Sequence, residues 1–178
     1  MSPDDIGINN PEVEEHADTD IVSNMLMFIH PGTRNIGGYK SSHHWVLQHG
    51  QFFVNEQLDR DLGPEKLCYY NSQRLMMGSL TTNYPLLYVE GYVSVHGMPI
   101  EHGWNITPDG EVIDTTLRID GAEYFGFVFS KNFVMVHIDS EGMGFPIIHN
   151  WQAGFPMLRD NVVVHAGADQ WNWKWDLG

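Results

Sequence analysis

Cysteine is almost absent from this chain: Cys68 is the only one among 178 residues. A single cysteine cannot form a disulfide within the chain, which agrees with a reducing compartment. No stretch approaches ~18 uninterrupted apolar residues, so the sequence predicts no transmembrane helix and no membrane partner. The N-terminal residues lack the basic start and apolar middle of a secretory signal, so we expect a cytoplasmic protein.

Basic residues are also scarce, with 9 lysines and arginines against 23 acidic residues and a formal net charge of −14. A surface of this charge repels phosphate backbones, which argues against nucleic acid as a partner. The excess of acidic residues is interpreted most simply as a means of keeping the chain soluble. An acidic face that attracts a basic partner, or that imitates nucleic acid, is the alternative.

The length and the apolar content of 42% predict one globular domain with a core of its own. We assign this domain to residues 21–178. Residues 1–20 are acidic and contain few large apolar side chains, so we expect a loosely packed segment there.

The motifs that would bind a cofactor or a metal are incomplete. In "PGTRNIGGYKS", two residues separate Gly37 from Lys40, so the contiguous Gly-Lys-Ser of a phosphate-binding loop is missing. His43, His44 and His49 lie in "SHHWVLQHGQFFVNEQ", which we interpret as one or two strands with a turn near Gly50. Adjacent histidines of a strand point to opposite faces, and no cysteine cluster supplies further ligands. We therefore expect no cofactor and no metal.

The stretch "PEKLCYYNSQRLMMGS" predicts a helix that carries Cys68 about one turn from its start. Pro64 is favoured at a first helical position, and Gly78 is a natural stop. A cysteine close to a helix N-terminus gains thiolate stability from the helix dipole, whereas a buried structural thiol is the usual fate of a free cysteine.

The residues after this helix mostly predict β-strands. Short stretches rich in β-branched and aromatic residues alternate with turn residues: "LLYVEGYVSV", "HGWNI", "EVIDTTL", "YFGFVF", "NFVMVHI" and "NVVVHAG". We therefore predict an α+β fold in which a central helix carrying Cys68 packs on a mainly antiparallel sheet. The tail "QWNWKWDLG" alternates Trp171, Trp173 and Trp175 with polar residues, which indicates either a strand at the sheet edge or an aromatic surface for a partner.

Three residues could together perform acyl transfer through a thiol. Cys68 would be the nucleophile, His102 would accept its proton, and Asp114 would orient the histidine. His102 and Asp114 lie on the two arms of a hairpin that turns through "TPDG". The two residues are directly opposite if the loop runs over 106–110, whereas a four-residue loop over 107–110 places them on opposite faces unless a bulge intervenes.

The order of these segments resembles the transglutaminase-like branch of the papain-like thiol enzymes. The matching residues are Cys68, Gly91-Tyr92, His102 with Trp104, and Asp114 with Thr116. The resemblance covers roughly residues 64–117. Gly103 stands where alanine is usual in that branch, and Thr115 stands where proline is usual.

The resemblance implies a papain-like/transglutaminase-like core, a catalytic triad of Cys68, His102 and Asp114, and a thioester intermediate formed from a protein or peptide substrate. Amide hydrolysis, peptidase action and transfer to an amine are all compatible with it. The alternative is a non-catalytic acidic interaction protein, such as an inhibitor, decoy or assembly factor, that retains the fold.

Several polar residues near these segments have more than one interpretation. Gln48, Gln51 and Gln57 precede the helix and are candidates for an oxyanion donor, but no motif selects one of them. Glu90 lies in an apolar strand and would need a buried partner, for which Arg74 or a tyrosine hydroxyl is available. We expect Glu101 to be solvated, because it faces away from His102.

Overall fold

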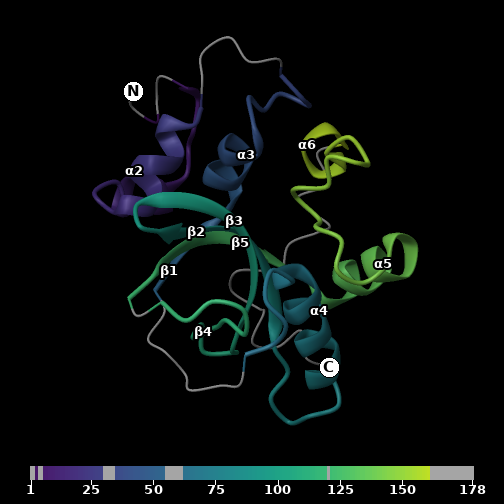
Figure 1. The fold of residues 1–178 in the computed structure, drawn as a ribbon. Helices are drawn as coiled ribbons and strands as arrows, with labels where there is room; N and C mark the ends of the chain where they lie inside the picture. The colour runs from purple at the N-terminus through teal and green to yellow at the C-terminus, as the bar shows by residue number, and fades with distance from the viewer. Residues whose placement is uncertain (1–2, 4–5, 30–34, 55–61, 120, 161–178) are drawn as a thin grey trace.

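Figure 1 shows the fold in a computed structural model that describes residues 3, 6–29, 35–54, 62–119 and 121–160. The elements in chain order are α1 (Pro11–Glu15), α2 (Asp20–Met27), α3 (Ser42–His49), β1 (Gln51–Val54), α4 (Cys68–Ser79), β2 (Leu87–Val95), β3 (Met98–Ile106), β4 (Val112–Ile113), β5 (Glu123–Phe129), α5 (Lys131–Glu141) and α6 (Pro156–Asp160). The expected strand "NVVVHAG" and the tryptophan-rich tail lie outside the described residues, as does Gln57. Among the helices that the structure describes, none is long and apolar enough to cross a membrane.

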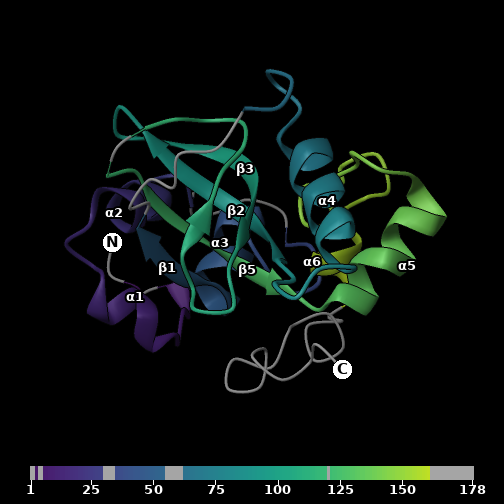
Figure 2. The ribbon, with the colours of Figure 1, turned by 90° about the horizontal axis from the view of Figure 1, so that it is seen from below.

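The strands form one antiparallel sheet in the order β1-β5-β2-β3-β4. β2 and β3 make a long hairpin in which Gly91 lies opposite His102. The sheet is strongly curved, with α2 and α3 on one side of it, and α4 packs along β3 and β2 (Figures 1 and 2). A mixed α+β fold with an antiparallel sheet, as predicted from the short β-branched and aromatic stretches, is therefore confirmed.

Both faces of the sheet are buried, because successive residues of a strand point to opposite sides. Tyr88 and Tyr92 of β2 belong to the core that the helices cover, together with residues of α2 and α3. Val89 of β2 and Trp104 of β3 belong to a second core on the other face. By the same alternation, His102 shares the face of Trp104, while Gly103 faces α4.

Two stretches predicted as strands are helices. Residues 42–49 form α3, whose N-cap Ser41 accepts a hydrogen bond from the His44 N–H. "NFVMVHI" lies in α5, where the N-cap Ser130 accepts one from Phe133. In both cases the serine directly before the helix accepts a hydrogen bond from a backbone N–H of the first turn, which has no acceptor within the helix. This local bond favours a helix over the β propensity of the residues that follow.

The acidic N-terminal segment is packed more closely than predicted. Ile6, Ile8 and Val13 are all buried in the main core. The buried side-chain amide of Asn10 donates to the carbonyls of Leu47 and Gly50, which ties the segment to the end of α3. A few apolar residues within an acidic stretch are thus sufficient to anchor it, because each buries its whole side chain.

Gly103 is a point of close approach between β3 and α4. A Cβ at this position would lie 2.9 Å from Tyr69 Cδ1 and 3.1 Å from Ser72 Oγ. We expect Gly103→Ala to lower the free energy of unfolding by about 1–3 kcal/mol, because the helix must shift away from the strand. Urea denaturation followed by tryptophan fluorescence measures this change.

Gly78→Ala is the matched control for this substitution, because Gly78 is helical, exposed and has no atom within 4 Å of its would-be Cβ. Alanine should raise the stability there by up to about 1 kcal/mol. Equal stability of Gly103→Ala and the wild type would contradict the close approach.

Candidate active site

Cys68 is the first residue of α4, whereas the sequence predicted a helix that begins near Pro64. Lys66 has a left-handed backbone with φ 60°, and the N-cap Leu67 has φ −118° and ψ 43°, so the helix cannot extend upstream. The correction places the half-buried thiol at the very end of the helix rather than one turn inside it.

The start of α4 presents free backbone donors to the thiol's surroundings. The first N–H that bonds back along the chain belongs to Asn71, which donates to the Leu67 carbonyl at 2.8 Å. The N–H groups of Cys68 and Tyr69 precede that bond and lie at the positive end of the helix dipole. Negative charge is stabilised at such a position, whether it is a thiolate or a reacting oxyanion.

His102 lies between the thiol and a carboxylate. Its ring is 3% exposed, and Nε2 lies 2.7 Å from Oδ2 of Asp114. Cys68 lies near enough to the ring to raise the pKa of His102. Because Nε2 is engaged by Asp114, Nδ1 is the nitrogen available to the thiol. The three predicted site residues therefore lie together, with the ring hydrogen-bonded to the carboxylate and next to the thiol.

The Asp114 carboxylate is held by further donors. Its Oδ1 accepts from the backbone N–H groups of Thr116 at 2.8 Å and Leu117 at 3.0 Å. Its Oδ2 accepts from the Tyr124 hydroxyl at 2.9 Å besides facing His102. This turn closed by the aspartate side chain constrains the backbone at Thr115, where the resemblance would place a proline.

The hairpin that joins His102 to Asp114 has neither of the two loops considered from the sequence. Ile106 pairs with Val112, and the Thr107 N–H donates to the Glu111 carbonyl, so the loop runs over 107–111 rather than 106–110 or 107–110. If this register continues by one residue, Asp114 lies opposite Trp104 and diagonal to His102. Diagonal neighbours share a face, so the side chains still meet without a bulge.

Aromatic side chains surround the His102 ring. Trp104 stacks on it with ring centroids 6.3 Å apart and an interplanar angle of 12°, and the Tyr124 ring lies at the same centroid distance. Trp104 is completely buried. The aromatic walls exclude water from the His102–Asp114 bond, which strengthens it. Tyr124 was not singled out from the sequence, although its strand "YFGFVF" was.

The surroundings raise the pKa of His102 and lower the pKa of Asp114. Burial lowers the pKa of His102, but the hydrogen bonds from Asp114 and Cys68 and the charges of these groups outweigh burial and raise it to about 9. Burial raises the pKa of Asp114, but the His102 hydrogen bond and charge and the backbone donors outweigh that and lower it. An imidazolium–carboxylate pair is thus the stable form near neutral pH.

Asn71, one turn after Cys68, joins the segments on either side of the helix start. Its amide donates to the Pro64 carbonyl at 2.8 Å and to the Thr116 hydroxyl at 2.9 Å. The Gly63 N–H donates to the Thr115 carbonyl at 2.7 Å. These bonds fix the chain after Asp114 against the start of α4, which holds the line from thiol to carboxylate in place.

The glutamines considered as oxyanion donors are engaged elsewhere or distant. The Gln48 side chain bonds to both backbone groups of Asn9. Gln51 lies on β1, which β5 and β2 separate from β3. Gln57 lies outside the described residues. The backbone N–H groups at the start of α4 therefore remain as the best-placed donors for an oxyanion.

A second histidine–carboxylate pair lies on the α4 side of the sheet. Glu90 is completely buried, and its oxygens accept from the Tyr88 hydroxyl, from the backbone N–H groups of Ile147, Ile148 and His149, and from the His149 ring at 3.0 Å. The expected tyrosine hydroxyl is thus one partner, and the backbone of 147–149 is the partner that the sequence did not indicate.

The Glu90–His149 pair also contacts Tyr69, the residue that follows Cys68. The Tyr69 hydroxyl lies 3.4 Å from His149 Nδ1, so adjacent residues of α4 contact the two histidines. Arg74 takes no part among the bonds of Glu90. Glu101, as expected, is largely exposed, and its carboxylate lies 4.0 Å from His149 Nε2.

The histidines considered as metal ligands all contact neighbouring side chains or backbone groups. The Tyr39 hydroxyl lies 2.6 Å from His49 Nε2, His44 Nδ1 accepts from the Lys40 N–H, and His43 stacks on Tyr92. Among the described residues, no group of three potential metal ligands converges.

Comparison with known proteins finds no matching family model, no similar curated protein and no similar solved structure.

Proposed function

We propose that this protein is a cysteine-dependent acyl-transfer enzyme with a papain-like/transglutaminase-like core, acting on an amide of a protein or peptide substrate. The observation that carries the proposal is the buried His102–Asp114 hydrogen bond with the Cys68 thiol close to the His102 ring. The protein's single cysteine is consistent with a reducing compartment such as the cytoplasm.

In the proposed reaction, Cys68 Sγ attacks the substrate carbonyl carbon while its proton resides on His102. The oxyanion forms beside the N–H groups at the start of α4. The carbon–nitrogen bond then breaks, and the His102 proton passes to the leaving amine, which leaves a thioester on Cys68. Water or a second amine attacks the thioester, loses its proton to the ring, and releases the acyl group from sulfur.

The proposal predicts a thiol that reacts in the folded protein at mildly acidic pH. We expect iodoacetamide to alkylate Cys68 at pH 6 about tenfold faster than it alkylates glutathione, as is typical of a cysteine paired with a histidine. Mass spectrometry of samples quenched over time measures the rate. Alkylation that occurs only after denaturation would overturn the proposal and favour the non-catalytic acidic interaction protein.

A further inference from the structure

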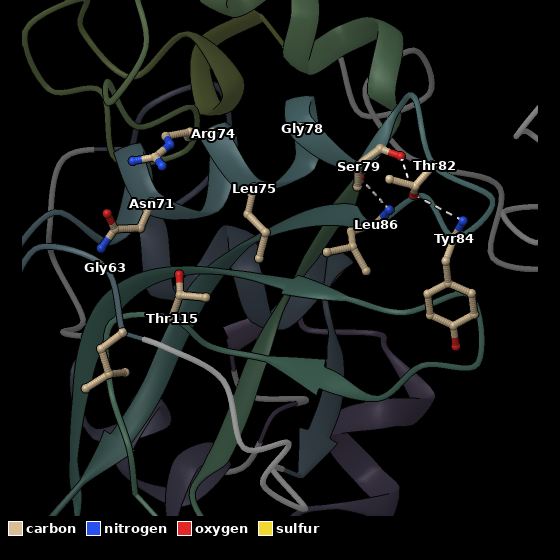
Figure 3. Close-up of a pocket in the computed structure, with 11 residues that line it drawn as sticks. Gly63, Asn71, Arg74, Leu75, Gly78, Ser79, Thr82, Tyr84, Leu86 and Thr115 are labelled. Carbon is tan, nitrogen blue, oxygen red and sulfur yellow. Dashed lines mark hydrogen bonds between the residues drawn. The ribbon is translucent and has the colours of Figure 1, made fainter.

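A pocket of about 730 Å³ lies along α4, where residues from Asn71 to Ser79 line it, C-terminal to Cys68. In Figure 3, α4 forms one wall and the segments of Gly63 and Thr115 the other, with Thr82, Tyr84 and Leu86 at the far end. Pockets of this size hold small organic molecules. The occupant would lie beside the thiol's helix rather than on the thiol itself.

The pocket and the triad share two structural supports. Asn71 lines the pocket and is also the residue whose amide ties Pro64 to Thr116. Thr115 lines it and directly follows Asp114. An occupant therefore contacts the same short segments that hold the His102–Asp114 pair.

The wall of the pocket is mainly hydrocarbon with a single charge. Leu62, Leu75 and Leu86 supply the apolar surface, and Arg74 is the only charged residue among the described residues that line it. No aspartate or glutamate in the same part of the chain lines the pocket, although the full sequence has 23 acidic residues against 9 basic ones. The charge that the described lining contributes is therefore positive, in a protein of net charge −14.

Arg74 is also uncommitted in the described part of the chain. Its side chain is exposed and makes no ion pair or hydrogen bond with another described residue. Asp109 accepts from the Tyr84 hydroxyl at the opposite end of the pocket. A guanidinium above leucine side chains suits an anion that carries an apolar body, because its planar fork binds carboxylates with two hydrogen bonds.

We infer that this pocket binds a small amphipathic carboxylate, with the carboxylate on Arg74 and the hydrocarbon against Leu75 and Leu86. Binding itself does not depend on the proposed reaction. The role of such a molecule as acyl donor, acceptor or effector of the triad does rest on the proposed function.

Isothermal titration with decanoate tests the site, with decanol as the uncharged probe of equal length. We expect saturable binding of decanoate, weakened about tenfold or more by Arg74→Gln, because a hydrogen bond between charged groups is lost. Decanol should bind the wild type and Arg74→Gln equally. Lys131→Gln, which removes a charge at the start of α5, is the control and should change neither affinity.

Gly78→Leu blocks the pocket without disturbing the fold, because Gly78 lines it, is helical and has no atom within 4 Å of its would-be Cβ. This variant should lose decanoate binding while its unfolding midpoint is maintained or raised. Absence of saturable binding, or binding that survives Gly78→Leu, would overturn the site. Equal decanoate affinity in Arg74→Gln and the wild type would overturn the assignment of the carboxylate to Arg74.

Cys68→Ala separates this inference from the proposed function. The variant should bind decanoate with the affinity of the wild type, since the thiol does not line the pocket. Failure of Cys68 to react with iodoacetamide would leave the binding result intact, and loss of decanoate binding would leave the thiol result intact.

Discussion

His102→Ala should slow the alkylation of Cys68 by iodoacetamide at pH 6 about tenfold. Without the imidazolium, the sulfur loses its charged partner. An ordinary thiol, with a pKa of about 8.5, is less than ~1% ionised at pH 6 and reacts slowly. A less stabilised thiolate is the stronger nucleophile, which limits the size of the decrease. Stopped-time mass spectrometry at several pH values measures the ratio.

The wild-type pair should respond to pH in a defined direction. Because the pKa of His102 is raised from 6.5 to about 9, the pair's contribution to folding is complete below pH 6.5 and is lost as the pH rises through about 9. The lowered pKa of Asp114 gives the opposite limit, where stability is lost as acid protonates the carboxylate. Urea midpoints measured across pH should therefore fall on both sides of a mildly acidic optimum.

Two variants control for the removal of a buried side chain. His137→Ala deletes an exposed imidazole of α5 and should leave the alkylation rate unchanged. Asp114→Asn keeps an oxygen for the Thr116 and Leu117 N–H groups but removes the charge, so it should slow the reaction while the chain still folds. Circular dichroism checks folding. A rate in folded His102→Ala equal to that of the wild type would remove His102 from the site.

Glu90→Gln should lower the free energy of unfolding by about 3 kcal/mol or more. The carboxylate accepts five hydrogen bonds from both of its oxygens, whereas a glutamine amide offers only one oxygen and turns a donor toward groups that are themselves donors. Burial raises the pKa of Glu90, but the His149 hydrogen bond and charge and the backbone donors outweigh that and lower it. Stability is therefore present above the ordinary pKa of a glutamate and lost as the pH falls through the lower, folded value.

Glu101→Gln is the matched control, one strand away and largely solvent-exposed. It should change the unfolding free energy by less than about 0.5 kcal/mol. Urea denaturation followed by tryptophan fluorescence compares the two variants. Similar small effects for both would show that Glu90 does not hold residues 147–149 to the sheet.

The sequence was sufficient for the central strands of the sheet, and it supplied the three residues of the candidate triad. Short runs of β-branched and aromatic residues in 87–95 and 123–129, bounded by turn residues, predict strands. It was insufficient at 42–49 and 131–141, where β-type residues form helices behind a capping serine. Local bonds and tertiary packing together override a weak propensity there.

The convergence of the triad was open from the sequence, since a shift of one residue in a hairpin reverses which face each side chain occupies. The loop over 107–111 is neither of the two considered from the sequence, yet it leaves His102 and Asp114 on one face as diagonal neighbours. The residue at which α4 begins was also open from the sequence. In the structure, the left-handed backbone of Lys66 prevents the helix from starting earlier and places Cys68 at its N-terminus.

By itself, the sequence determined the class of fold and the net charge of −14, which follow from composition and from short runs of strand-forming residues. The order of its segments also pointed to three candidate residues for thiol chemistry. Only the tertiary structure decided that the thiol, ring and carboxylate meet, that Glu90 binds the backbone of 147–149, and that Arg74 borders an apolar pocket. Each of these joins segments far apart in the chain, and no local pattern encodes the distance between them.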